Sequence, residues 1–198
     1  HPDEAVSKRA TGVFAKLNAG SNSSKDEVIA KLRPEVEKPG DIAKGKEVKV
    51  IDDLTVDLIT EKHGLEKIKT IGDAYMATTG IGSDSEDHAN DMINIAHEFI
   101  SYLENRNKTS RQAWNCRIGI HSGEIIAGIV GKSRFIYDIL GDSVNIAARL
   151  VSKAAPAQII VSETVRTLLE GASIFEPLGE VELKGRTGKL NIYSAGWK

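Results

Sequence analysis

Cysteine, aromatic residues and long apolar runs are all scarce in this sequence. The single cysteine, Cys116, has no partner for an internal disulfide, which fits a reducing cytosol. Aromatic residues make up 5% of the chain and the formal net charge is −2, whereas a nucleic-acid-binding domain usually shows a basic face with stacking aromatics. No apolar run approaches the roughly 18–20 residues of a membrane span, and the N-terminal residues do not form a signal peptide. We therefore expect no nucleic-acid partner and a cytoplasmic location, or the cytoplasmic face of a larger protein whose membrane segments lie outside this chain.

The 198 residues suit a single domain with a sizeable core. Residues 1–50 show little pattern: a strand-like run at 10–17 is followed by a Gly/Ser/Asn-rich loop and a Lys/Glu-rich stretch that contains Pro34 and Pro39. Prolines there should break the stretch into short pieces. Residues 51–198 carry clear helix and strand patterns. We therefore expect one domain over residues 1–198, with its regular part in residues 51–198.

The patterned part alternates helices and strands. Before residue 110 we expect a helix over 51–64 that ends at Gly64, a hairpin of strands 67–71 and 74–79, and a helix over 87–105. Next come strands at 115–121 and 124–130 separated by a Ser-Gly turn, a strand at 134–139 and a helix from 142 to about 151. The tail indicates a strand at 158–162, a helix at 162–170 and strands at 180–185 and 189–194. This order is typical of an α/β (α+β) fold with a ferredoxin-like split βαββαβ core, extra C-terminal strands and an antiparallel-containing sheet covered by helices.

The hairpin 67-KIKTIGDAYMATTG-80 contains two charged residues that its backbone does not require. Gly72 and Asp73 form a two-residue turn, in which the glycine supplies a positive φ. Asp73 is a candidate ligand for a hard cation such as Mg²⁺, although Gly-Asp turns also occur for backbone reasons alone. Lys69 interrupts an otherwise apolar strand, and a buried lysine usually has a partner. Its ammonium could also reach solvent at the edge of the sheet.

The stretch 134-RFIYDILGDSVNIAARL-150 indicates a strand followed by a helix that Asp142 caps. Val144, Ala147 and Val151 would form the buried stripe of that helix. Asn145 and Arg149 are four residues apart and therefore share one face. An amide and a guanidinium side by side could bind an anion, and a solvated face with a paired arginine is the alternative interpretation.

Three further features have structural explanations. The glycines of 119-GIHSGEIIAGIVG-131 fit no phosphate-binding loop, so turns or close packing explain them better. His121 could act as a base, but a hydrogen-bonded structural histidine is the simpler interpretation. Cys116 alternates with apolar positions, which predicts buried packing.

These segments together resemble the class III nucleotide cyclase catalytic domain, the adenylate and guanylate cyclase family. The resemblance runs from about Leu54 to Tyr193. Its most specific parts are 66-EKIKTIGDAYMA-77, 117-RIGIHSGEIIAGIVG-131 and 137-YDILGDSVNIAARL-150. Members of this family are phosphorus–oxygen lyases that make a 3′,5′-cyclic nucleotide and pyrophosphate from a nucleoside triphosphate. The resemblance implies that function here.

The resemblance assigns roles to individual residues. Asp73 matches a metal-binding aspartate, Asn145 the residue that orients the ribose and Arg149 the residue that stabilises the transition state. Lys184, in 182-ELKGR-186, resembles the lysine that contacts the triphosphate. The resemblance further implies two Mg²⁺ (or Mn²⁺) ions per site and a homodimer in which both protomers contribute to each site.

Lys69 and Asp138 match the pair that reads the base. Lysine only donates hydrogen bonds and an ionised aspartate only accepts them, which suits the amino group and ring nitrogen of adenine. Guanylate cyclases of this family carry a glutamate and a cysteine at these positions. We therefore expect ATP as the substrate and an adenylate cyclase as the enzyme, with a guanylate cyclase as the weaker alternative.

One expected residue is missing from the pattern. The family places its first metal aspartate at the end of the opening strand, whereas 13-VFAKL-17 has Lys16 at that position. A lysine cannot bind Mg²⁺. The chain is then either a degenerate cyclase with impaired metal binding, or it lacks a segment so that Ala15 and Lys16 are not neighbours in the complete protein. A catalytically silent module that binds nucleotide or regulates a partner by dimerising is therefore the alternative function.

Overall fold

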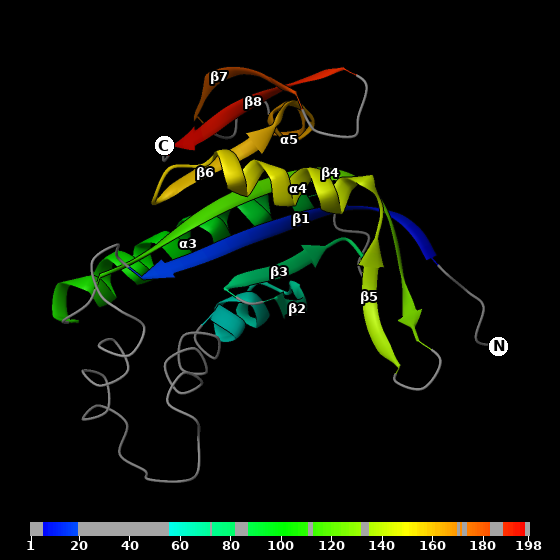
Figure 1. Ribbon diagram of the computed structural model, residues 1–198, viewed down its shortest axis with the longest axis horizontal. Coiled ribbons are helices and arrows are strands. Elements are labelled where there is room, and N and C mark those ends of the chain that lie inside the picture. The colour runs from blue at the N-terminus through cyan, green and yellow to red at the C-terminus, as the bar shows by residue number, and fades with distance from the viewer. Residues whose placement is uncertain are drawn as a thin grey trace, which may run out of the picture.

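An eight-stranded mixed sheet organises the described part of the chain (Figure 1). The computed structural model describes residues 6–19, 56–71, 73–81, 87–110, 113–131, 135–169, 171, 174–182 and 188–196, and for residues 6–19 it describes the backbone alone. The strands are β1 Val6–Ala19, β2 Glu66–Ile71, β3 Ala74–Thr79, β4 Trp114–Val130, β5 Ile136–Leu140, β6 Gln158–Ser162, β7 Ile174–Glu182 and β8 Lys189–Gly196. They lie in the order β2-β3-β1-β4-β6-β8-β7, and β5 pairs with β4 outside this path. Only β4 and β6 pair in parallel among the described strands.

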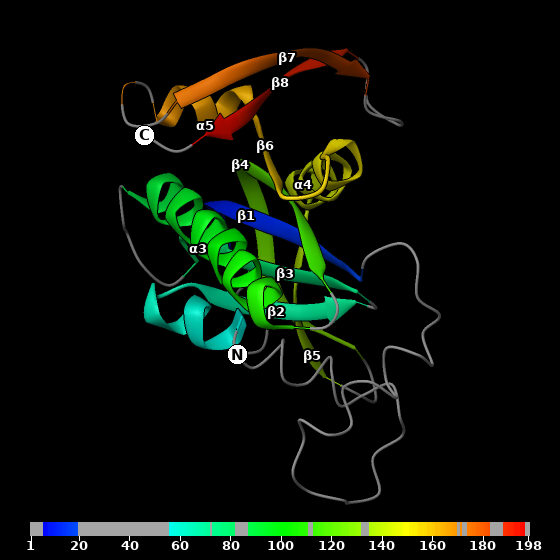
Figure 2. The ribbon, with the colours of Figure 1, turned by 90° about the vertical axis from the view of Figure 1, so that its left-hand side faces the viewer.

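Helices cover both faces of this sheet (Figure 2). Residues 56–62 form a short helix. The other described helices are α3 His88–Thr109, α4 Asp142–Lys153 and α5 Glu163–Leu168. Strand β6 shows how the faces divide, because Ile159 and Val161 pack in the cluster that contains α3, whereas Ile160 packs with residues of α4. This arrangement confirms the predicted α/β fold with helices on a mixed sheet. No helix among these is long and apolar enough to span a membrane.

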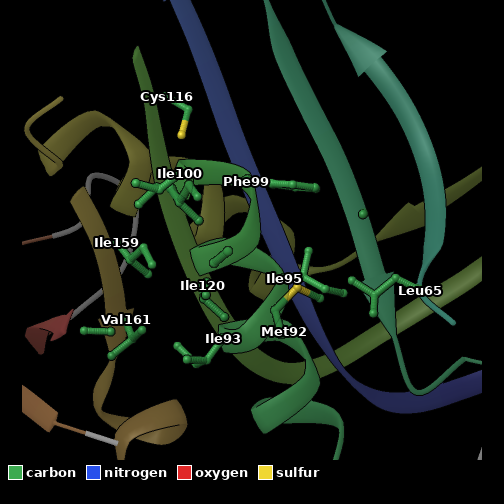
Figure 3. Packing of buried hydrophobic residues seen from close by; sticks show 14 of the residues in the cluster. Leu65, Met92, Ile93, Ile95, Phe99, Ile100, Cys116, Ile120, Ile159 and Val161 are labelled. Atoms are coloured by element: carbon green, nitrogen blue, oxygen red, sulfur yellow. The ribbon is translucent and has the colours of Figure 1, made fainter. Parts of the chain in front are cut away.

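The main core lies between α3 and the sheet (Figure 3). The predicted stripe of α3 is confirmed, because Ala89, Met92, Ala96, Phe99 and Leu103 are all buried. Side chains at this spacing share one helix face, which here meets Ile118 and Ile120 of β4. Cys116 is 2% exposed within the same cluster, and burial raises the pKa of its thiol to about 12. The prediction of buried packing for Cys116 is therefore confirmed, and the thiol stays protonated at neutral pH.

The hairpin and the helix before it are close to the sequence prediction. Strands β2 and β3 pair as predicted, with Ile71 opposite Ala74. Gly72, with its predicted positive φ, lies outside the described residues. The preceding helix ends at residue 62, and Gly64 adopts a φ of +69°. The Gly64 N–H donates to the carbonyl of Glu61 and the Leu65 N–H to that of Thr60, which is the Schellman pattern of a glycine-terminated helix. The predicted residues 51–55 of this helix lie outside the described residues.

The predicted turn at Ser122 and Gly123 is wrong. β4 runs without interruption from Trp114 to Val130, and Ser122 and Gly123 pair with Thr11 and Ala10 of β1. A continuous strand can contain glycine where a neighbouring element approaches it closely, because glycine has no side chain to occupy that space. A Cβ at Gly123 would lie 2.4 Å from the Ser143 hydroxyl of α4. The glycine therefore makes room for a helix and does not form a turn.

Other boundaries differ from the predictions by a few residues. β1 extends beyond the predicted 10–17 at both ends, because β4 offers it pairing partners along the whole of 6–19. α3 continues to Thr109, and β5 begins at Ile136. β7 begins at Ile174, earlier than the predicted 180, because β8 pairs with it from Gly196 onward. The extensions of β1 and β7 come from pairing with distant strands, which local patterns do not contain.

His97 gives this core a dependence on pH. Its side chain lies in α3 with 5% exposure, and burial lowers the pKa of its imidazole below the usual value. The unfolded chain then binds a proton at His97 more readily than the folded chain does. The stability that comes from burying the neutral imidazole is therefore present above about pH 6.5 and is lost as the pH falls below it. We expect His97→Gln to flatten the loss of Tm between pH 7.5 and 5.5 in calorimetric scans. Parallel curves for the two proteins would contradict the assignment.

Candidate active site

Lys69 and Asp138 are 69 residues apart in sequence and in direct contact in the fold. The Lys69 ammonium on β2 donates to Oδ2 of Asp138 on β5 at 2.5 Å. Both side chains are partly exposed, at 33% and 18%. The other carboxylate oxygen, Oδ1, accepts the backbone N–H of Ile139 at 2.9 Å, which fixes the orientation of the carboxylate. A donor and an acceptor thus lie side by side, and both remain partly exposed to solvent.

A small apolar cluster, the Met76 cluster, contains chain neighbours of this pair. It consists of buried Met76, Ile125, Ala127 and Ile139, with Ile68, Ile81 and Val144 packed against them. The neighbours in sequence of Lys69, Asp138 and Asn145 belong to it, namely Ile68, Ile139 and Val144. The predicted base-reading pair and the start of α4 are therefore fixed to one common packing unit.

Helix α4 carries the other two residues of the predicted catalytic set. Asn145 is exposed and Arg149 half-buried, one turn apart on the same helix. The Arg149 carbonyl accepts the Ser152 hydroxyl at 2.6 Å. Both side chains of this predicted pair are thus in reach of solvent, as substrate binding requires.

Two details of α4 differ from the prediction. Gly141 is the N-cap and Asp142 the first helical residue, with no hydrogen bond from a capping side chain. The buried stripe contains Ala147 and Val151 as predicted, but Val144 is only half-buried and Ile146 and Leu150 are buried. The stripe is wider than predicted because α4 also packs against β6 and β8 through Ile160 and Ile192.

The position of α4 depends on glycine in β4. A Cβ at Gly119 would lie 2.6 Å from the Ala147 carbonyl oxygen, 2.6 Å from the Val151 nitrogen and 2.9 Å from the Leu150 Cβ. Two of these atoms belong to the helix backbone, so the helix rests directly on the strand. This close approach confirms the close-packing interpretation of Gly119.

The start of α4 is fixed to β4 at a second place. Gly141 has a φ of +142°, which side chains rarely tolerate, and a Cβ there would lie 3.1 Å from the Glu124 carbonyl oxygen. The Ser143 hydroxyl donates to the same carbonyl at 2.8 Å. Sequence reasoning did not identify Ser143, since the carbonyl it binds belongs to a different element.

Asp73 lies exposed in the turn between β2 and β3. In the register of β1, Lys16 lies opposite Ala74, next to Asp73 in the chain, and β1 continues through Ala15 and Lys16 without a shift in register. The described residues contain no group of three or more histidine, cysteine or acidic side chains that could hold a metal. The carboxylate of Asp73 suits one ligand of Mg²⁺, but a two-ion site does not fit a lysine at the second expected position.

Lys184 and His121 are the remaining residues that the sequence singles out. Lys184 lies outside the described residues, so its predicted contact with the triphosphate stays a prediction. His121 is 7% exposed, and its Nδ1 lies 2.8 Å from the hydroxyl of buried Ser162 on β6. This contact joins β4 to β6 and favours the structural interpretation of His121.

Comparison with known proteins extends these observations. The sequence profile of the adenylate and guanylate cyclase catalytic domain matches residues 46–195. An adenylate cyclase of Mycobacterium tuberculosis is 32% identical over 142 residues, covering 72% of this chain and 32% of that protein. The guanylate cyclase soluble subunit beta-2 of Rattus norvegicus is 37% identical over 140 residues, covering 69% of this chain and 20% of that protein. The chain thus spans a third or less of the length of these curated relatives.

The fold has a close counterpart among solved structures. The adenylyl cyclase CyaB from P. aeruginosa superposes with a TM-score of 0.81 at 21% identity, covering 98% of this chain and 97% of the other. At that identity the likeness concerns the fold. The relatives include both adenylate and guanylate cyclases, so the choice of nucleotide has to be argued from this chain's own residues.

Gly119 allows a test of the α4 contact. We expect Gly119→Ala to destabilise the protein by about 1–3 kcal/mol, because the added methyl must displace the helix backbone. Gly128→Ala is the matched control on the same strand, since a Cβ there meets nothing within 4 Å. Thermal unfolding followed by circular dichroism measures both. Equal Tm values for the two variants would show that α4 does not rest on Gly119.

Proposed function

This chain belongs to the adenylate and guanylate cyclase catalytic-domain family, and on that premise we propose that it is an adenylate cyclase domain. The proposed reaction converts ATP to 3′,5′-cyclic AMP and pyrophosphate. The observation that supports ATP over GTP is the contact between Lys69 and Asp138, which places one obligate donor beside one obligate acceptor.

Recognition of the base follows from the hydrogen-bonding capacity of this pair. Adenine presents an amino donor and a ring-nitrogen acceptor, which Asp138 and Lys69 can satisfy. Guanine presents an oxygen acceptor and an N–H donor at the corresponding atoms, so both partners would face groups of their own kind. A site with polar groups left unpaired by the wrong substrate discriminates strongly against it.

The chemical step forms the bond between the ribose 3′-oxygen and the α-phosphorus and breaks the bond from that phosphorus to pyrophosphate. Arg149 is proposed to stabilise the charge that develops on the α-phosphoryl oxygens, and Asn145 to hold the ribose in line for attack. Both side chains project from α4, whose position β4 fixes at Gly119 and Glu124. The hydroxyl proton passes to solvent or substrate, since no described side chain is assigned as its base.

The partner is proposed to be a second copy of this chain. Exposed apolar side chains concentrate on β4, on β5 and at Phe135 just before β5, with Ile129 73% and Phe135 75% exposed. Ile126, Val130, Ile136 and Leu140 are also large and exposed there. Apolar patches of this kind mark interaction surfaces. A two-fold dimer would bring Asp73 of one protomer toward Lys69, Asp138, Asn145 and Arg149 of the other, which gives two equivalent sites.

A catalytically silent nucleotide-binding module is the second candidate. The observation that favours it is Lys16 in the register position beside Asp73, where a second carboxylate would be needed for two ions. The preserved Asn145 and Arg149 favour the enzyme, since binding alone requires neither.

Product analysis tests the proposed function. We expect the purified dimer to form cyclic AMP from ATP, and no cyclic GMP from GTP, when supplied with Mg²⁺ or Mn²⁺ and followed by chromatography. Arg149→Ala should lower kcat by roughly 10²–10³-fold, as the loss of one preorganised donor does. Arg166→Ala is the control, because Arg166 lies on α5 over the ring of Tyr193.

Three results would contradict the proposal. ATP binding without product under either metal would support the silent module. Cyclic GMP as the main product would overturn the assignment of ATP. Turnover by a monomer at micromolar concentration would overturn the shared-site dimer.

The base-reading pair has its own test. We expect Lys69→Glu combined with Asp138→Cys to shift the ratio of kcat/KM from ATP toward GTP, because the donor and acceptor are exchanged for groups that suit guanine. Lys189→Glu combined with Glu180→Cys makes the same chemical change at an exposed ion pair between β7 and β8. The measured quantity is product formed from each nucleotide. An unchanged ratio in the first double variant would break the assignment.

A further inference from the structure

Two lysines of β2 point to opposite faces of the sheet although they are two residues apart. In a regular strand, residues i and i+2 share a face. Here Lys67 lies opposite Ala77 and Lys69 opposite Met76, so the ladder shifts by one residue between them. This irregularity is a β-bulge that contains Ile68. Because Ala77 and Met76 are consecutive, the two lysines face opposite sides.

Lys67 joins a polar network on the face of the short helix 56–62. Its ammonium contacts Oδ2 of Asp57 at 2.6 Å and lies 5.2 Å from the centre of the Tyr75 ring. The Tyr75 hydroxyl donates to Oδ1 of the same aspartate at 2.8 Å and lies 3.1 Å from the Thr60 hydroxyl. Asp57 therefore connects the helix to both strands of the hairpin.

Lys69 faces the other way, toward Asp138. Ile68 packs against the Met76 cluster on that same side. If the strand were regular from the turn onward, Lys67 would lie opposite Thr78 and share the face of Lys69. The bulge thus selects one register in which Lys67 reaches Asp57 and Lys69 reaches Asp138 together.

We infer that Lys67, Asp57 and Tyr75 are positioning residues for base recognition: their network holds the bulged register of β2 and thereby holds Lys69 against Asp138. None of the three touches the predicted base-reading pair in the contacts described above. They act through the strand, since Lys67 and Lys69 flank Ile68. This inference rests on the proposed function for its link to the nucleotide, whereas its structural part concerns the hairpin alone.

The test compares Lys67→Met with two matched variants. Lys67→Met keeps an unbranched side chain and removes the ammonium. Lys67→Arg keeps a cation near Asp57. Lys62→Met removes the same charge from the same short helix, where Lys62 forms an ion pair with Glu98 of α3 at 2.9 Å. For each variant, kcat and KM are measured with ATP and GTP, and hydrogen exchange is measured for the amides of β2 and β4.

We expect Lys67→Met to lower the ATP-to-GTP ratio of kcat/KM by roughly 10- to 100-fold, since small misplacements of a recognition group have effects of that order. Exchange should become faster in β2 and stay unchanged in β4. Lys67→Arg should restore both readouts, and Lys62→Met should alter neither. Faster exchange in β2 with an unchanged nucleotide ratio would reduce the network to a structural role and overturn the inference. Unchanged exchange in β2 would overturn it as well.

Failure of the proposed function gives a different result. In that case the unaltered protein forms no cyclic nucleotide and shows no preference between ATP and GTP. The exchange measurement then decides the structural part alone: selective loosening of β2 by Lys67→Met upholds the positioning of the hairpin, and its absence overturns it.

Discussion

The contact of α4 with β4 at Gly119 is the constraint on which the candidate site depends. Helix backbone lies within 2.6 Å of where a Cβ would be, so there is no side chain between the two elements to adjust the distance. Interiors at this packing density transmit displacement directly. Asn145 and Arg149 take their positions from this helix, and any shift of α4 over the strand moves both together.

The rest of the site is held in place by a small apolar cluster. The Met76 cluster has four buried members, compared with the larger core between α3 and the sheet. Its buried members come from β3, β4 and β5, and Ile68 of β2 and Val144 of α4 pack against them, so the cluster connects the elements that carry Lys69, Asp138 and Asn145. Few buried contacts imply a low local free energy of opening. The hydrogen bond from Ser143 to the Glu124 carbonyl therefore contributes more to the geometry of the site than it would beside the main core. The Asp57 network supports β2 from the opposite face, where Tyr75 packs in the main core.

Local sequence patterns predicted the elements that local physics determines. The pairing of the hairpin strands, the stripe of α3 and the termination at Gly64 depend on residues near one another in the chain, and all three are confirmed. Local patterns do not predict the continuity of β4 through Gly123, because that glycine makes room for Ser143 of α4, some twenty residues later in the chain. The bulge at Ile68 was missed for a similar reason, since its register is fixed by partners on two other elements.

The candidate site shows the same difference between features that the local sequence determines and features that distant contacts determine. No periodicity or spacing connects Lys69 to Asp138; only the resemblance to a family did so before the fold placed them in contact. Asp142 seemed a suitable cap by residue type, but the positive φ and close approach at this position require glycine, so Gly141 is the cap. The roles proposed for Asn145, Arg149 and Asp73 follow from the chemistry of their side chains, and the fold supplies their positions.

One half of the proposed site, the metal-binding turn at Asp73, lacks an expected carboxylate, whereas the half formed by β2, β5 and α4 has all its expected residues. Two-fold symmetry would repeat this difference in both sites. In a two-fold homodimer each site would combine the turn of one protomer with β2, β5 and α4 of the other. A carboxylate missing beside Asp73 is then missing from both sites equally, and pairing two identical chains cannot restore it. Mg²⁺ commonly binds through one or two carboxylates together with substrate phosphates. A homodimer of this chain must therefore rely on Asp73, the phosphates and water for its ions, or take a carboxylate from residues outside the described part of the chain.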